Sequence, residues 1–236
     1  MSGFYSTPCS AMAPGVTIPR HVHVQAYATI VLDGGYQEAG DGGRWDVRSG
    51  DVLLHAPFSA HWDLVTPRGA RVLNLPLLAP IQLSACGQVG DLDLVIRLTM
   101  RDQVEAAAVL MQNWRQTQNA LNDAPDLMAH AMSDADPFGV QSWASANGVS
   151  RVTAFRCFRS AYGVEPTRYR VEARARAAWQ MIVSSKLSLA EVAAAAGYAD
   201  QAHMSRDVKA FTGRSPGVWR SGDGLKHSFK TEMHQY

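Results

Sequence analysis

The first 80 residues alternate short apolar runs with glycine, proline and aspartate. The apolar runs are 26–32, 45–47, 52–54, 61–66 and 70–77. Turn signals of the Asp-Gly and Thr-Pro kind fall at 33–35, 41–43, 49–51 and 66–67. Several short strands at close spacing are typical of a small sandwich or barrel, so we expect a β domain over this stretch.

The next stretch changes from turn residues to helical periodicity. Residues 80 to about 100 contain Pro80, Gly87 and Gly90 and are predicted to form a connector. Apolar residues then recur every three or four positions over 99–121, which predicts a helix that ends before Pro125. This helix could cover the sheet of its own chain or pack against a second copy, and the pattern leaves both open.

Residues 126–183 are predicted to be helical, with a short helix at 126–132 and a second at 140–146. Ser150 can cap a further helix over 151–162, and Gly163 can end it in the left-handed region. Pro166 suits the first turn of a long helix that runs to about Val183. At 1.5 Å per residue, that helix is about 27 Å long. Its basic residues are Arg168, Arg170, Arg174 and Arg176, which either contact phosphate or form a solvated face.

The pattern repeats after residue 187. Ser188 and Glu191 have the spacing of a capping box, and Gly197 can end this short helix. Asp200 can cap the next helix, which Gly213 stops. Two helices joined by a glycine-bearing turn form a helix-turn-helix, whose second helix enters the DNA major groove. Periodicity alone also fits a packed helix hairpin of any helical protein.

Charge separates the two halves of this chain of 236 residues. Residues 140–236 hold 14 Lys and Arg against 7 Asp and Glu, whereas residues 1–139 hold 8 against 14. The halves therefore carry +7 and −6, and we expect only the C-terminal half to contact phosphate. We find no membrane span or signal pattern, and three widely spaced cysteines argue against a disulfide framework or zinc ribbon. A cytoplasmic location is expected.

Two segments resemble the paired helix-turn-helix units of the AraC/XylS family of transcription regulators. The residues that fit the first unit, within 143–170, are Ala144, Gly148, Ser150, Arg156, Phe158, Gly163, Pro166 and Tyr169. Those that fit the second are Ser188, Glu191, Val192, Ala193, Gly197, Tyr198, Asp200, His203, Ser205, Arg206, Lys209, Gly213, Ser215, Pro216, Trp219 and Arg220. The sequence departs from the family at Ala154, Ala202, Met204 and Val208, where Leu, Ser, Phe and Phe are usual.

The N-terminal stretch resembles the cupin sensor domain of many such regulators. Gly15, His21, His23 and Gly34 follow the first cupin motif, and Gly50, Asp51, Pro57 and His61 follow the second. Metal-binding cupins use two early histidines, a glutamate and a late histidine. The glutamate position falls here at 26–27 and is lost, so Glu38 and His55 are the candidates to replace it.

The histidines also suggest a site on chemical grounds. His21 and His23 lie two residues apart, so on a strand they point the same way. With His61 they could complete a three-nitrogen site for zinc, nickel or iron. Alternatively, the polar residues bind an organic effector or have a structural role. The predicted effector pocket comprises His21, His23, Tyr27, Glu38 and His61.

The two recognition helices supply the candidate DNA contacts. Candidates for base reading are Arg151, Val152, Phe155 and Arg156 in the first, and Gln201, Ala202 and Arg206 in the second. Arg156 and Arg206 are the leading candidates, because a guanidinium can bond guanine N7 and O6 together. Phe155 either presses on a thymine methyl or repacks the core. Candidates for phosphate contacts are Arg159, Lys209 and Arg214.

These observations predict a two-domain α+β protein with a cupin-like β-barrel and following helices, then an all-α double helix-turn-helix domain. The predicted boundaries are 1–80 for the sensor, 81–125 for the connector and possible dimerisation helix, 126–222 for the DNA-binding domain and 223–236 for a polar tail. The resemblance implies a homodimeric regulator that binds double-stranded promoter DNA under the control of a small-molecule effector. The alternatives are a metal-dependent cupin enzyme or metal sensor fused to a DNA-binding domain, and an effector-independent architectural regulator.

Overall fold

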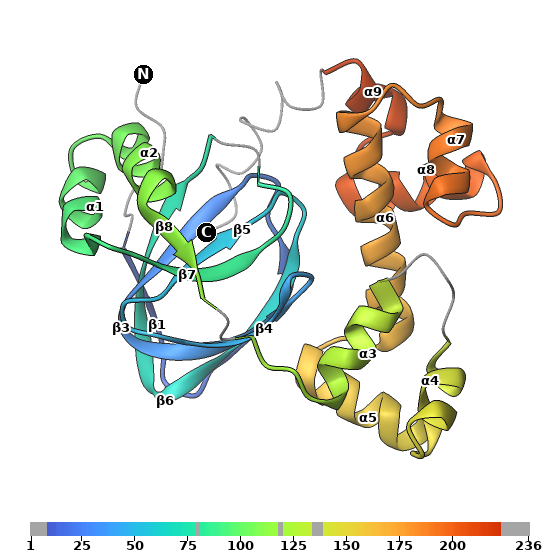
Figure 1. Cartoon of the computed structure of the whole chain (residues 1–236), viewed down its shortest axis with the longest axis horizontal. Coiled ribbons are helices and arrows are strands. Elements are labelled where there is room, and N and C mark those ends of the chain that lie inside the picture. Colours follow the sequence, from blue (N-terminus) through green and yellow to red (C-terminus); the bar gives the residue numbers. More distant parts are fainter. Residues whose placement is uncertain (1–8, 79–80, 118–119, 134–138, 223–236) are drawn as a thin grey trace. The chain divides into compact units, whose positions relative to one another are not determined.

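A computed structural model describes residues 9–78, 81–117, 120–133 and 139–222, and the predicted polar tail lies outside these ranges. The chain divides into two compact units, Met1–Asp126 and Leu127–Tyr236. The first is rich in strands and the second is helical, which confirms the α+β class (Figure 1). No helix in the described ranges is long and apolar enough to cross a lipid bilayer.

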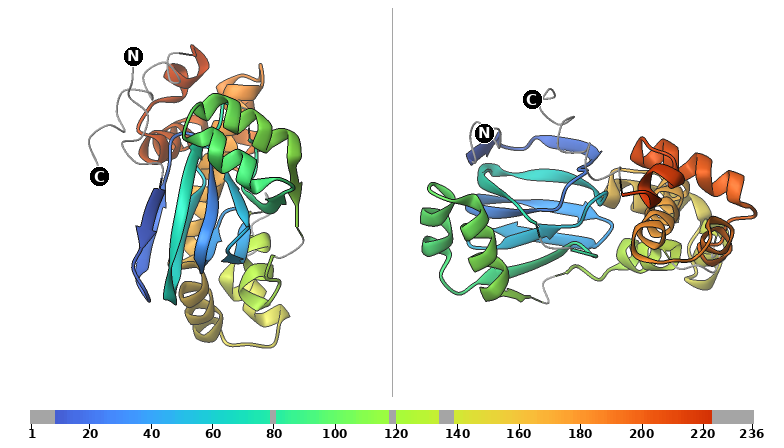
Figure 2. Two further views of the ribbon diagram at one scale, coloured as in Figure 1. Left: turned by 90° about the vertical axis from the view of Figure 1, so that its left-hand side faces the viewer. Right: turned by 90° about the horizontal axis from the view of Figure 1, so that it is seen from above.

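The strands of the first unit form one curved antiparallel sheet (Figure 2). The strands are β1 Cys9–Met12, β2 Thr17–Val22, β3 Tyr27–Gly40, β4 Gly43–Arg48, β5 Val52–His55, β6 Ala60–Pro76, β7 Ala85–Val89 and β8 Trp114–Gln116. Within the described residues the order is β1-β6-β3-β5-β7-β8, with β2 on β6 and β4 on β3. This path is open, so the closed form of the predicted barrel is not seen.

Two of the four predicted turns are irregularities inside long strands. The strands β3 and β6 pass through 33–35 and 66–67 without ending, and the register between them shifts on both sides of Gly34. Gly34 has φ +69° and lies so close to Gly69 that a Cβ there would collide with its carbonyl oxygen. Glycine therefore marks a bulge at this point, which local turn signals cannot distinguish from a chain reversal.

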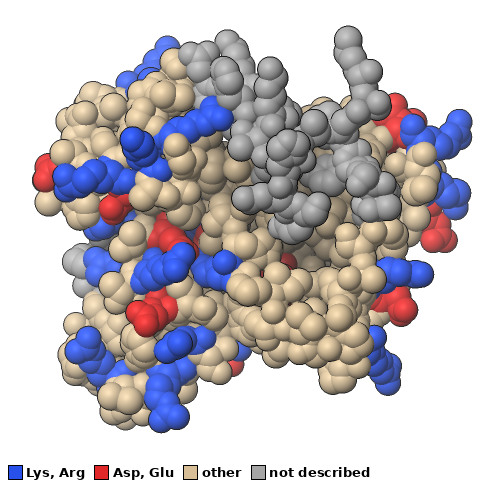
Figure 3. Space-filling model, turned by 180° about the vertical axis from the view of Figure 1, so that it is seen from behind, with Lys and Arg blue, Asp and Glu red and all other residues tan. Residues whose placement is uncertain are grey.

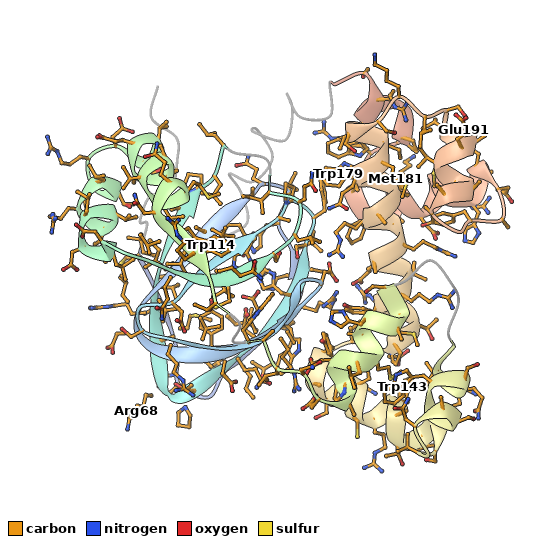
Figure 4. The ribbon with its side chains drawn as sticks, viewed as in Figure 1. Arg68, Trp114, Trp143, Trp179, Met181 and Glu191 are labelled. Atoms are coloured by element: carbon orange, nitrogen blue, oxygen red, sulfur yellow. The ribbon has the colours of Figure 1, made fainter. Side chains whose placement is uncertain are left out.

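The predicted helix at 99–121 is wrong in its bounds, because the helical region is broken and shorter. Helix α1 (Leu92–Thr99) and helix α2 (Gln103–Asn113) are separated at Asp102, whose carboxylate caps α2. The predicted connector also contains β7. Trp114, labelled in Figure 4, leaves the helix and starts β8. Its indole lies so close to Gly87 that a Cβ there would collide with it.

Helices α1 and α2 cover the sheet of their own chain. Ala106 and Leu110 of α2 are buried against Ile30, Leu73 and Leu75 of the sheet. Burial of these side chains supplies the main stabilisation of this contact. The sequence pattern left open whether this helix covers its own sheet or packs against a second copy. Helix α2 covers its own sheet.

The helices of the second unit follow the predicted caps closely. They are α3 Ala124–Ser133, which begins at the end of the first unit, α4 Val140–Ala146, α5 Arg151–Tyr162, α6 Pro166–Ser184, α7 Leu189–Ala195, α8 Gln201–Thr212 and α9 Pro216–Arg220. Ser150 and Asp200 cap α5 and α8, and Ser188 and Glu191 form the complete capping box of α7. Pro125 was predicted as a stop but lies in the first turn of α3, where a missing N–H costs nothing.

Candidate nucleic-acid interface and histidine cluster

The long helix α6 carries one helix-turn-helix near each of its ends. Near its start, the Tyr169 ring packs edge-on against Phe158 and Tyr162 of α5, with ring centroids 5.3 and 5.4 Å apart. Near its end, Trp179, labelled in Figure 4, packs edge-on against Trp219 of α9, with ring centroids 5.7 Å apart. With 19 residues, α6 is roughly 28 Å long, close to the spacing of successive major-groove segments of about 34 Å.

The first helix-turn-helix consists of α4 and α5, with Gly148 in the turn at φ +67°. Helix α5 buries Ala154, Phe158, Ala161 and Tyr162. Its opposite face exposes Arg151, Val152, Arg156 and Arg159, which were predicted to contact DNA. Phe155 is half-buried, so its position allows both of the roles considered for it.

The second helix-turn-helix consists of α7 and α8. Helix α8 buries Met204 and Val208, and both positions depart from the family pattern, so the changes affect the core. The exposed face presents Gln201, Ala202, Arg206 and Lys209. Arg214 is half-buried, with its guanidinium 5.8 Å from the centre of the Trp219 ring.

Arg174 connects α6, the linker helix, to the second helix-turn-helix, a role that the sequence pattern did not reveal. Its guanidinium lies 4.0 Å from the centre of the Tyr198 ring and donates to Asp207 Oδ2 at 3.4 Å. Asp207 also lies 3.5 Å from His203 Nε2, one turn earlier in α8. Burial, and then Asp207, raise the pKa of Tyr198 to about 12. Arg174 is therefore a structural residue and not part of a solvated face.

Positive side chains gather on the surface of the C-terminal unit, at the left in Figure 3. The exposed ones on the recognition helices are Arg151, Arg156, Arg159, Arg206 and Lys209. A face of this charge attracts the phosphate backbone of nucleic acid. Each recognition helix thus combines an apolar inner side with a basic outer side.

The three motif histidines of the N-terminal unit converge. His21 of β2 stands opposite His61 of β6 in the strand register, and their ring centroids are 4.3 Å apart. His23 lies 4.9 Å from His21 and 5.6 Å from His61. One ligand atom from each of the three lies within 4.8 Å of the others. His21 and His23, whose i, i+2 spacing predicted that they point the same way, are therefore close enough to His61 for all three to bind one ion or molecule.

A second group of the same size lies deeper and shares His61. It consists of Glu38 of β3, His55 of β5 and His61, all of them buried, with ligand atoms again within 4.8 Å of one another. His55 Nδ1 lies 3.6 Å from Glu38 Oε1. The Tyr27 ring stacks on His55 at 4.2 Å, and its hydroxyl is 3.4 Å from His61 Nε2.

Burial moves the groups of this deeper set toward their neutral forms. It raises the pKa of Glu38 well above its usual range, with a further contribution from Asp63, its partner across the strand pair. It lowers the pKa of His55 to about 3 and that of His61 well below its usual value, with neighbouring histidines adding to both effects. The contact between His55 and Glu38 is consequently not an ion pair at neutral pH.

The motif histidines fit a metal ion in part. Nδ1 of His21 is 2.9 Å from the Pro19 carbonyl, and donation to it would fix the ring and leave Nε2 as the ligand atom. The position of the lost glutamate falls at Ala26 and Tyr27, and neither side chain offers a carboxylate. The motif set therefore supplies three nitrogen donors and no negative charge.

The helical unit is thus a DNA-binding domain with two helix-turn-helix units joined by a linker helix. Residues 143–222 match a family model described as a helix-turn-helix domain, which agrees with the helix-turn-helix units predicted for this stretch. Comparison with curated proteins gave no match.

Several solved structures are similar to the chain, all with low TM-scores. The C-terminal domain of AraT, a response regulator from Geobacillus stearothermophilus, is 25% identical over 42% of this chain and 81% of its own, with a TM-score of 0.38. The DNA-binding domain of AdpA in complex with a target DNA is 24% identical over 47% and 99%, with a TM-score of 0.40. Fatty-acid-bound ToxT from Vibrio cholerae is 10% identical over 93% and 97%, with a TM-score of 0.41.

Proposed function

We propose that the chain is a transcription regulator and not an enzyme, and that it reads a specific promoter sequence with both helix-turn-helix units. The observation that carries this proposal is the pairing of two exposed basic recognition helices on one linker helix. Because α6 is nearly as long as one turn of the duplex, both helices can enter successive major-groove segments on one side of the DNA.

The exposed side chains of each recognition helix divide into those that contact base edges and those that contact phosphate. Arg206 and Arg156 read base edges, with Gln201, Ala202, Arg151 and Val152 beside them. Phe155 remains a candidate for apolar contact with a thymine methyl. Arg159, Lys209 and Arg214 bind phosphate and supply affinity and salt dependence.

The N-terminal unit is the sensor in this proposal. Its pocket residues are His21, His23, Tyr27, Glu38 and His61. Tyr27, Glu38 and His61 are buried, and burying their polar groups is costly unless a ligand uses them. The effector is then a small ligand that changes how the regulator binds DNA in the cytoplasm.

The working form is a homodimer, as the resemblance implies. Exposed apolar side chains on the α1–α2 segment, such as Met100 and Val104, support a contact surface there. Sedimentation of the full chain tests this assembly, and a monomer at working concentrations would contradict it.

Arg206→Ala and Lys209→Ala form a matched pair that tests the reading of DNA. Affinities for a selected site and for a scrambled duplex are measured over a range of salt concentrations. Arg206→Ala should lower the preference for the selected site by about 5- to 150-fold, the equivalent of 1–3 kcal/mol for one bidentate base contact. Lys209→Ala should weaken binding to both duplexes alike and reduce the salt slope by about one.

The two variants must differ for the proposal to stand. If Arg206→Ala keeps the wild-type ratio of affinities, α8 does not read bases through this side chain. If Lys209→Ala changes the ratio, it is a base contact and not a phosphate contact.

A further inference from the structure

We infer that Glu38, His55 and His61 form a binding site for one divalent transition-metal ion inside the N-terminal sheet. The three side chains come from β3, β5 and β6, which the sheet order places side by side. This set differs from the one implied by the cupin motif, since Glu38 and His55 take the place of His21 and His23. It also contains the carboxylate that the motif set lacks.

Unpaired buried atoms are the first observation. Across the described part of the chain, Nδ1 of His55, Nδ1 of His61 and Oδ1 of Asp63 are among the buried side-chain atoms without a hydrogen-bond partner. A buried polar atom without a partner destabilises the folded protein unless something binds it. Here the orphaned atoms belong to two ligand histidines and to the carboxylate beside Glu38. A cation bound by Glu38, His55 and His61 could use the two histidine nitrogens.

The spacing of the donors is the second observation. Two ligands at about 2.1 Å from a tetrahedral ion are about 3.4 Å apart. His55 Nδ1 and Glu38 Oε1 are 3.6 Å apart, and suitable atoms of all three residues lie within 4.8 Å of one another. Shifts of less than about 1 Å in side-chain position therefore complete the coordination.

The chemistry of the donors selects the ion. Two imidazole nitrogens and one carboxylate suit zinc, iron(II), cobalt or nickel, and they are a poor set for calcium or magnesium. A neutral imidazole offers a nitrogen lone pair to such an ion. A bound dication would offset the burial of Glu38 and favour its ionised form.

The outer histidines, His21 and His23, differ from the deeper group in exposure and in charge, since they bring no carboxylate. His21 is partly exposed, and its Nδ1 already contacts the Pro19 carbonyl. His23 is also partly exposed and lies against the Tyr27 ring at 4.7 Å. Both cover the deeper group without contributing a ligand. Binding of the ion stands on these observations alone, and only its role as effector rests on the proposed function.

The test uses the full chain, stripped with a chelator and then titrated with Zn²⁺ or Co²⁺. Bound metal is measured by mass spectrometry after desalting, affinity by calorimetry, and coordination by the visible absorption of Co²⁺. We expect one ion per chain, visible Co²⁺ bands, and a loss of affinity of at least about tenfold in Glu38→Gln and His55→Asn. The exposed control His130→Ala should keep the wild-type affinity, and His21→Ala should lose less affinity than Glu38→Gln.

Folding of the variants is controlled by circular dichroism and by the melting temperature without metal. Glu38→Gln changes one atom and keeps the volume, so it remains informative if His55→Asn does not fold. Failure of the wild-type chain to bind either metal would overturn the site. Loss of binding in His21→Ala, with normal binding in Glu38→Gln, would assign the ion to the outer histidines and overturn it as well.

A final experiment tests whether the metal bound at this site controls DNA binding. Affinity for a selected DNA site is measured with and without Zn²⁺ in the wild type and Glu38→Gln. A metal-dependent change that Glu38→Gln lacks supports the ion as the effector. Metal binding without any change in DNA affinity contradicts that role, whereas loss of sequence preference under all conditions counts against the proposed function itself.

Discussion

Arg174→Met tests how the linker helix holds the second recognition helix. Methionine is a long side chain like that of arginine, but it lacks the guanidinium. In Arg174 this group lies 4.0 Å from the Tyr198 ring centre and 3.4 Å from Asp207 Oδ2. A partly exposed cation–π contact contributes about 1 kcal/mol. The ion pair, whose side chains are 23% and 20% exposed, contributes about 1 kcal/mol more. We expect the free energy of unfolding of the C-terminal unit to fall by about 2 kcal/mol.

The assay is urea denaturation of the full chain, followed by tryptophan fluorescence, since Trp143, Trp179 and Trp219 lie in this unit. Arg168→Met is the matched control on the same helix. Its side chain is 74% exposed and paired with Glu172 at i, i+4, so its loss should cost less than about 0.5 kcal/mol. Equal stability of the two variants would refute the structural role of Arg174.

Two further substitutions test the framework of the helix-turn-helix units by thermal or urea denaturation. Phe158→Ala should cost about 3–5 kcal/mol, because its ring is fully buried between Tyr162 and Tyr169, and a loss below about 1 kcal/mol would refute that packing. Gly213→Ala should cost about 1 kcal/mol, because the residue ends α8 at φ +75° in open space and only backbone strain opposes the methyl group. An unchanged stability of Gly213→Ala would contradict that reasoning.

The helical half could be predicted in detail because its signals are local. A capping side chain and a left-handed glycine act within a few residues, so Ser150, Ser188, Asp200 and Gly213 marked helix ends that the structure confirms. The role of Arg174 was hidden, because its partners are 24 and 33 residues away in the chain and only the packing of α6 on α8 brings them together.

The N-terminal half was less predictable because strand pairing acts over long distances. Glycines at 34 and 35 carry the same local signal in a bulge as in a turn, and only the pairing of β3 with β6 decides between them. Trp114 left the predicted helix for the same kind of reason, since its contact with Gly87 is nonlocal. The spacing of His21 and His23 predicted their convergence, but the approach of His55 to Glu38 depends on the register of three strands.

Selection of binding sites from a random duplex library tests the central proposal most directly. The full chain is incubated with the library at moderate salt, bound DNA is amplified over several rounds, and the enriched sequences are aligned. Two recognition helices on one linker helix predict two short conserved blocks about one helical turn, roughly 10 base pairs, apart. Arg206→Ala should erase the block read by α8 and keep the other. Enrichment of no sequence, or loss of both blocks or neither in Arg206→Ala, would contradict a regulator that reads DNA with two separate units.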